Sequence, residues 1–334
     1  MDMPQKIEIS HRTIIFTVLF LLLLWFLFQI RQILVIFFVG LIVMSALNPL
    51  AERLEKWKIP RVLTLALIYL GILALISLVV AGLIPPLVSQ TSTLVSRFPQ
   101  YLDGLNLSQF SENILDKQMN QFLHLLESIS GNLMKIIGAV FGNFVVFFTV
   151  IFVSFYLLLE RKKLDDYLFR FFGHTQDKKI AQIIYKVETR LGEWVRAQLT
   201  LMIIVGIMSY LGLRILGIDY ALPLALLAGV LEIVPNIGPV LSAIPAVLVG
   251  LLISPLMGLA VVALYFLVQQ LENNLIVPQI MAKETGINPL ITILALLAGF
   301  QLGRITGTVL AVPLVILAET LIKELIASDK FKKA

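Results

Sequence analysis

The chain has 334 residues, of which 59% are hydrophobic and only 14% are charged, and its mean hydropathy is +0.95. A soluble domain of this size cannot bury so much apolar surface, because its interior is limited by the ratio of surface to volume. The composition therefore predicts an integral membrane protein. The basic residues behind the net charge of +5 follow the ends of apolar segments, which indicates membrane topology and not nucleic-acid binding.

The residue types also exclude several kinds of chemistry. The chain has no cysteine, and its three histidines, His11, His124 and His174, lie in polar stretches, so we expect no metal site and no resident cofactor. Walker A, HExxH and GxSxG sequences are absent, which argues against ATP hydrolysis and against a hydrolase. We therefore expect a protein that is not an enzyme, with H⁺ or Na⁺ as its only coupling partner.

Apolar runs long enough to cross a bilayer predict about six spans. A typical span needs about 20 apolar residues. The first run follows Lys6 and Arg12, but it is longer than a signal-peptide core and lacks a small-residue cleavage site, so we interpret it as a retained anchor. The predicted spans lie at about 13–30, 33–50, 62–88, 136–159, 199–217 and 255–280.

Basic residues orient these spans. The linkers 51–61 and 160–198 and the tail 327–334 are rich in Lys and Arg, and the positive-inside rule places all three in the cytoplasm. The segment 89–135 has few basic residues and falls outside. Both termini are then cytoplasmic. The predicted organisation is spans one to three in 1–88, an extracytoplasmic segment 89–135, the fourth span with a cytoplasmic helix in 136–198, a transport core in 199–326, and the tail.

Two segments between spans have amphipathic helical patterns. The first is 89–135, which is too polar to span; its helices lie on the outer leaflet or pack against neighbouring subunits. The second is 177–198, which precedes the fifth span on the cytoplasmic side. Apolar residues recur at helical spacing in both, as in Leu115, Met119, Phe122, Leu123, Leu126 and Ile129, and in Ile180, Ile183, Ile184, Val187, Leu191 and Trp194.

Near the C-terminal end the phrase ALLAG occurs twice, at 225–229 and 295–299, and each copy opens a broken apolar segment. The first segment, 221–254, is interrupted at Pro235, Gly238 and Pro239. Each of its arms is about 14 residues, or about 21 Å, which is shorter than a hydrocarbon core of about 30 Å. Proline and glycine both break helices, so we expect a helical hairpin with its tip inside the membrane.

The second broken segment, 288–326, turns near Gly299, Gly303 and Gly307, with Arg304 as a candidate gate, anion partner or headgroup-level charge. Its arms are less equal, so it is either re-entrant or fully spanning. One span separates the two hairpins, and they therefore enter from opposite sides. The sequence predicts an all-α polytopic membrane protein whose two broken hairpins form an inverted repeat.

Polar residues inside these apolar segments are the candidate site. Glu232 lies three residues before Pro235, and a carboxylate at membrane depth is costly unless it is paired, hydrated or protonated. Asn236 and nearby carbonyls offer further oxygen ligands for a cation. The alternative for Glu232 is a structural hydrogen bond at the hairpin tip.

A second polar group lies in the middle of the sixth span. Its residues cannot all face lipid, and burial against the hairpins would place them beside Glu232 in a polar pocket. Amide packing between helices is the alternative. The group comprises Gln269, Gln270, Glu272, Asn273 and Asn274.

The runs LEIVPNIGPVLSAIPAVLVG and QQLENNLIVPQIMAKETGINPLITILALLAGFQLGRITGTVLAVP resemble the AI-2E family of bacterial transporters over nearly the whole chain. The resemblance rests on an E-x-x-P-x-x-G-P, a Q-x-x-E-N-x-x-x-x-P and a G-x-x-G-x-x-x-A-V-P element. It implies the bacterial inner membrane, a homo-oligomer such as a pentamer, and either export of autoinducer-2 or Na⁺(Li⁺)/H⁺ antiport. Arg304 departs from the family's glycine-rich turn.

Three functions follow from these observations. The first is a secondary transporter that exports a small polar organic molecule by ion-coupled alternating access, with membrane lipid and its cargo as partners. The second is a Na⁺(Li⁺)/H⁺ antiporter. The third is a non-transporting scaffold that works through 89–135, and deletion of that segment separates it from the other two.

Overall fold

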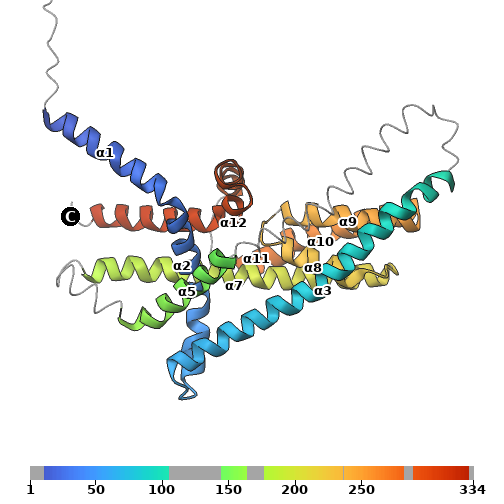
Figure 1. Cartoon of the computed structure of the whole chain (residues 1–334), viewed down its shortest axis with the longest axis horizontal. Coiled ribbons are helices and arrows are strands. Elements are labelled where there is room, and N and C mark those ends of the chain that lie inside the picture. Colours follow the sequence, from blue (N-terminus) through green and yellow to red (C-terminus); the bar gives the residue numbers. More distant parts are fainter. Residues whose placement is uncertain (1–10, 105–143, 164–176, 236, 282–288, 331–334) are drawn as a thin grey trace, which may run out of the picture.

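The structure, a computed structural model, describes residues 11–104, 144–163, 177–235, 237–281 and 289–330 (Figure 1). Within these residues every element is helical, and six helices are long and apolar enough to cross a membrane. This confirms the prediction of an all-α polytopic membrane protein. The helices are α1 (His11–Gln29), α2 (Arg31–Glu55), α3 (Arg61–Gly104), α5 (Phe144–Glu160), α7 (Asp177–Ile215), α8 (Ala221–Leu231), α9 (Ile237–Ile253), α10 (Pro255–Leu271), α11 (Val277–Met281) and α12 (Pro289–Lys330), with a short 3₁₀ turn η2 (Arg161–Lys163) and a π-helix η3 (Glu272–Ile276).

The first helices leave much apolar surface uncovered. Figure 1 shows α1 extending away from the other helices, and none of its span is buried, as expected of a helix whose surroundings are lipid. Helix α3 continues beyond the expected span end at 88 as far as Gly104. The amphipathic pattern in 115–129 and the start of the fourth expected span, 136–143, lie outside the described residues.

Helix α7 joins two elements that the sequence separates. The expected cytoplasmic helix 177–198 and the span 199–217 form one helix of 39 residues. The segment contains no proline, so its backbone has no reason to break where the side chains change from polar to apolar. The polar half packs against α2, so closely that a Cβ on Gly192 would lie 2.3 Å from the Ser45 carbonyl oxygen.

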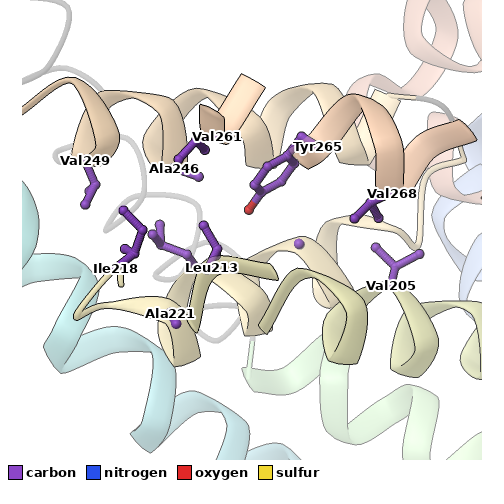
Figure 2. Packing of buried hydrophobic residues seen from close by; sticks show 11 residues of the cluster. Val205, Leu213, Ile218, Ala221, Ala246, Val249, Val261, Tyr265 and Val268 are labelled. Carbon is purple, nitrogen blue, oxygen red and sulfur yellow. The ribbon is translucent and has the colours of Figure 1, made fainter. Parts of the chain in front are cut away.

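Three apolar clusters hold the helices together. The first joins α2, α3 and α5 around Leu65 and Leu158. The second joins α2, the first half of α7 and α12 around Leu191 and Ile316. The third joins the second half of α7 to α8, α9 and α10 (Figure 2). The expected transport core, 199–326, is thus divided between two clusters, since its second broken segment in α12 packs in the second cluster with α2 and the first half of α7.

Ion pairs connect the polar ends of α2, α3, α5, α7 and α12. Arg161 and Glu188, both largely buried, are 2.5 Å apart, and Asn48 also donates to Glu188. The two linkers that the charge pattern assigns to one side of the membrane therefore meet in space with the end of α12 that precedes the tail. Their cytoplasmic location stays a prediction. The other pairs are Arg61–Glu55, Lys162–Glu55, Lys186–Glu324 and Arg190–Glu319.

The first broken segment has its break where the sequence places it. Helix α8 ends at Leu231, and α9 begins at Ile237. Gly238 donates its backbone N–H to the Val234 carbonyl at 2.9 Å. A Cβ on Gly238 would lie 2.0 Å from the Leu231 carbonyl oxygen, so the turn requires glycine at this position.

The second broken segment, within α12, bends at Arg304. Arg304 has φ 51° and ψ −131°, and one part of α12 lies across the page in Figure 1 while the other is seen end-on. Gly299 and Gly307 are in backbone contact across the bend, since a Cβ on Gly307 would lie 2.0 Å from the Gly299 carbonyl oxygen. A straight helix would separate residues eight apart by about 12 Å.

Candidate transport site

Two glutamates meet inside the transport core. Glu232 caps the end of α8 at the break, and Glu272 is the first residue of the π-helix that follows α10. Their exposed fractions are only 1% and 3%, and their carboxyl groups are close enough to influence each other electrostatically. Neither carboxyl oxygen of Glu232 has a hydrogen-bond partner among the described residues. Both were expected in the site from the sequence, and the structure brings them together from elements 40 residues apart.

The π-helix has a local cause and a geometric consequence. Val277 donates its N–H to the Glu272 carbonyl, five residues back, and Pro278 has no N–H to continue the normal ladder. Glu272 continues the buried face of α10 that Tyr265 and Val268 occupy, while the residues that follow it in the wider turn, from Asn273 to Leu275, are exposed. Single π-turns of this kind often lie at functional sites.

Two glutamines support the carboxylates. Gln269 donates its Nε2 to Glu272 Oε2 at 3.2 Å. Gln198, which is buried on α7, donates its Nε2 to the Glu232 main-chain carbonyl at 2.5 Å. Gln198 is not conspicuous in the sequence, because it lies where the amphipathic pattern of the expected cytoplasmic helix ends.

The other amides of the sixth span point away from Glu232. Gln270, Asn273 and Asn274 are exposed on the surface of the chain. Asn274 donates to Gln270 at 3.0 Å, and Gln269 donates to Asn273 at 3.4 Å. The expected pocket of five residues is thus divided, with Gln269 and Glu272 on the inside. Asn236 lies outside the described residues.

The expected hinge residues take different roles. The carbonyl of Pro239 accepts a hydrogen bond from the Ser242 hydroxyl at 2.9 Å, which fixes the start of α9. Gly303 has open space around it and no positive φ. Arg304, the candidate gate, has the positive φ at the second bend instead.

A cavity of about 820 Å³ lies elsewhere, between α2, α5, α7 and α12 near the ion-paired ends. Most of its lining is apolar, as at Leu41 and Leu317, and it includes neither Glu232 nor Glu272. The two carboxyl groups are therefore enclosed by helix packing and do not line this cavity.

The paired glutamates define what the site can do. Two neighbouring carboxylates away from water repel each other when both are charged, so binding of a proton or a cation stabilises the pair. Among the described residues no group of three or more His, Cys, Asp or Glu could hold a metal ion.

Comparison with known proteins decides the family. The model of the AI-2E family transporter matches residues 14–327, which is nearly the whole chain. The chain belongs to the AI-2E transporter family. Both broken segments and both buried glutamates lie inside the matched region of this AI-2E family member.

Several relatives are similar over most of their length. YueF of Bacillus subtilis (strain 168) is 30% identical over 284 residues, 80% of this chain and 77% of YueF. YrrI of the same strain is 28% identical over 310 residues, 87% of this chain and 86% of YrrI. Both carry names as transport proteins. The AI-2 transport protein TqsA of Escherichia coli (strain K12) is 27% identical over 307 residues, 88% of this AI-2E family chain and 86% of TqsA.

Proposed function

We propose that the chain is a secondary transporter of the bacterial inner membrane that exports a small polar organic molecule by ion-coupled alternating access. The observation that carries the proposal is that Glu232 and Glu272 are both almost completely buried and close enough for their carboxyl groups to influence each other. A carboxyl pair at membrane depth is costly to maintain, and such groups commonly mark ion and proton pathways.

The pair supplies the coupling. When one carboxyl group is protonated, the other can share its proton through a hydrogen bond. When both are ionised, a cation compensates their charge. Exchange between these two states is the minimum that coupling to H⁺ or Na⁺ requires. Gln269 holds Glu272 in place, and Gln198 holds the break that contains Glu232.

The two bends supply elements that move. Glu232 lies in the break between α8 and α9, and α12 bends at Arg304. Non-helical backbone at membrane depth is tolerated only where it is buried in protein or lines a water-filled path. An inverted repeat of the two broken segments, with cytoplasmic termini, accounts for access from both sides.

The proposed cargo follows from the named relative. TqsA carries the name AI-2 transport protein, and this chain is similar to TqsA over most of both chains. We therefore propose autoinducer-2 or a molecule of its size and polarity as cargo. Na⁺(Li⁺)/H⁺ antiport is the second candidate. The carboxyl pair favours antiport, because this function requires only sites for ions and no site for an organic cargo.

Exposed amides support assembly of several copies. Gln270, Asn273 and Asn274 are costly against lipid, and interhelical amide contacts in a homo-oligomer would cover them.

Flux measurements in liposomes test the proposal. Purified chain is reconstituted, and movement of autoinducer-2, Na⁺ and H⁺ is measured under imposed Na⁺ and pH gradients. Glu232→Gln and Glu272→Gln should each abolish the dependence of flux on the gradient, because an amide carries no exchangeable charge. Glu324→Gln, at an exposed ion pair far from the site, should leave flux unchanged.

Three outcomes separate the candidates. Gradient-driven autoinducer-2 flux that disappears in both glutamine variants supports the exporter. Na⁺-driven proton flux without autoinducer-2 movement supports the antiporter. If autoinducer-2, Na⁺ and H⁺ all fail to move under every gradient, the exporter and the antiporter are both contradicted.

A further inference from the structure

Two buried hydroxyl groups in the transport core are not explained by the carboxyl pair. Ser209 of α7 and Tyr265 of α10 have exposed fractions of 1% and 7%. Neither hydroxyl has a hydrogen-bond partner among the described residues. Buried polar groups in folded proteins nearly always have a partner, so each such group needs an explanation.

Another buried tyrosine shows the usual arrangement. Tyr69 of α3 is buried as well, and its hydroxyl donates to Ser154 of α5 at 2.7 Å. Ser154 in turn donates to the Ile151 carbonyl at 3.0 Å. The same two residue types are thus fully partnered in one place and unpartnered in the other.

Ser209 and Tyr265 lie at the same level of two packed helices. On one side of this level, Val205 of α7 and Val268 of α10 point toward each other (Figure 2). On the other side, a Cβ on Gly212 would lie 2.2 Å from Leu264. Since Ser209 lies between Val205 and Gly212 along α7, and Tyr265 between Val268 and Leu264 along α10, both lie at the level where α7 and α10 are in contact. Figure 2 shows the Tyr265 hydroxyl directed into the space between α10 and the helices opposite.

The polar groups of this interface form two layers. Tyr265 and Glu272 share a face of the α10 helix and are seven residues, or about 10 Å, apart. The apolar side chains of Val205 and Val268 lie between the hydroxyl layer and the carboxyl layer. A polar–apolar–polar order of this kind is expected of a route that is interrupted by a dry barrier.

We propose that Ser209 and Tyr265 form a second polar site on the transport route, which binds a hydroxyl group, either of water or of a hydroxylated solute. Each side chain can both donate and accept a hydrogen bond and carries no charge, which matches a hydroxyl group on both counts. Val205 and Val268 separate this site from the glutamates. The inference rests on the proposed function, because it extends the same route.

Cysteine labelling tests the site without any transport measurement. The chain has no cysteine, so Ser209→Cys introduces a single thiol of nearly the same size. In reconstituted full-length chain, this thiol should react with the small water-soluble reagent aminoethyl methanethiosulfonate severalfold faster than the thiol of Leu213→Cys. Leu213 lies one turn further along α7, is fully buried and belongs to the apolar cluster. Equal, slow reaction of both thiols, while an exposed Lys162→Cys reacts fully, would overturn the proposal.

Two further arms complete the experiment. Excess autoinducer-2 that slows the labelling of Ser209→Cys identifies a solute hydroxyl as the ligand, and unchanged labelling identifies water. If Ser209→Cys does not fold, Tyr265→Phe carries the test. If a bound ligand satisfies the Tyr265 hydroxyl, this variant should lower the thermal midpoint or leave it unchanged. Tyr69→Phe, which loses the bond to Ser154, should behave in the same way. A higher midpoint for Tyr265→Phe would show that the hydroxyl is unsatisfied and would reject the site.

The labelling and the flux can fail separately. Labelling of Ser209→Cys in a chain that moves no solute or ion leaves the hydrated site standing and removes the proposed transport function. Gradient-driven flux in a protein whose Ser209→Cys thiol does not react supports the transport function and rejects the second polar site.

Discussion

The carboxyl groups of Glu232 and Glu272 lie close together in the interior, although one lies in the break after α8 and the other begins the π-helix after α10. Both side chains are almost completely buried. Glu232 reaches this position at the break between α8 and α9, whereas Glu272 follows Val261, Tyr265 and Val268 on the buried face of α10 at regular helical spacing. A local break and a regular helix face together build the proposed coupling site.

Replacing Glu232 by Gln should stabilise the protein under alkaline conditions, where both carboxyl groups are ionised. The amide can donate a hydrogen bond to Glu272 and removes the repulsion between two carboxylates, so the free energy of unfolding should rise by about 1 kcal/mol. Where the wild-type pair holds a proton this repulsion is absent, so the difference should shrink as the pH falls. Thermal unfolding in detergent at acidic and mildly alkaline pH measures both effects. A destabilised variant at every pH would mean that Glu232 has a structural partner.

Gly307→Ala should disrupt the bend in α12. The new Cβ would lie 2.0 Å from the Gly299 carbonyl oxygen, which belongs to the backbone and cannot rotate away. Forced separation of this kind should lower the free energy of unfolding by about 2–3 kcal/mol. Gly303→Ala is the matched control, since nothing lies within 4 Å of its Cβ position. Equal thermal midpoints for the two variants would contradict the close contact at Gly299.

The breaks were predictable because their cause is local. Proline and glycine act on their own backbone, so Pro235 and Gly238 mark the first break in any context. The sequence does not predict the continuity of α7, because its side chains change from polar to apolar near residue 198. That change alters what the helix packs against, but it does not interrupt the backbone hydrogen bonds of the helix. The inverted repeat stays a prediction.

The sequence predicts a site residue only where the free-energy cost of burying its side chain in an apolar segment is large enough to mark it. Glu232 and Glu272 are conspicuous in apolar segments for that reason. Gln198, Ser209 and Tyr265 are not, because their importance depends on which helix lies opposite and in which register. That information comes from contacts between residues distant in sequence. The amides Gln270, Asn273 and Asn274 are equally conspicuous in the sequence, yet they are exposed on the surface of the chain. Polarity within an apolar segment therefore does not show whether a side chain faces the interior.

Glu188→Gln should weaken the junction between η2 and α7. Glu188 is buried and lies 2.5 Å from Arg161, so its loss leaves a largely buried guanidinium without its counter-ion. The cost should be about 2 kcal/mol, between the values for exposed and fully buried ion pairs. Glu324→Gln breaks the pair with the exposed Lys186 and should have a much smaller effect. Thermal unfolding of both variants compares them, and similar losses would show that burial of Glu188 is not decisive.

Arg304→Gly should stabilise the second bend. The φ of 51° and ψ of −131° at Arg304 belong to a backbone region that glycine adopts easily and other residues adopt at a cost. Relief of that strain, reduced by the greater freedom of glycine in the unfolded chain, should raise the free energy of unfolding by about 1 kcal/mol.

Arg304→Ala is the control for this variant, because it removes the charge and keeps the strain. Its thermal midpoint should not rise. Flux then shows what the side chain does: if Arg304 is a gate, the glycine and alanine variants both lose control of flux, whereas a purely conformational role affects the glycine variant alone. A rise in stability for alanine equal to that for glycine would show that charge at this depth, and not backbone strain, is what Arg304 costs the fold.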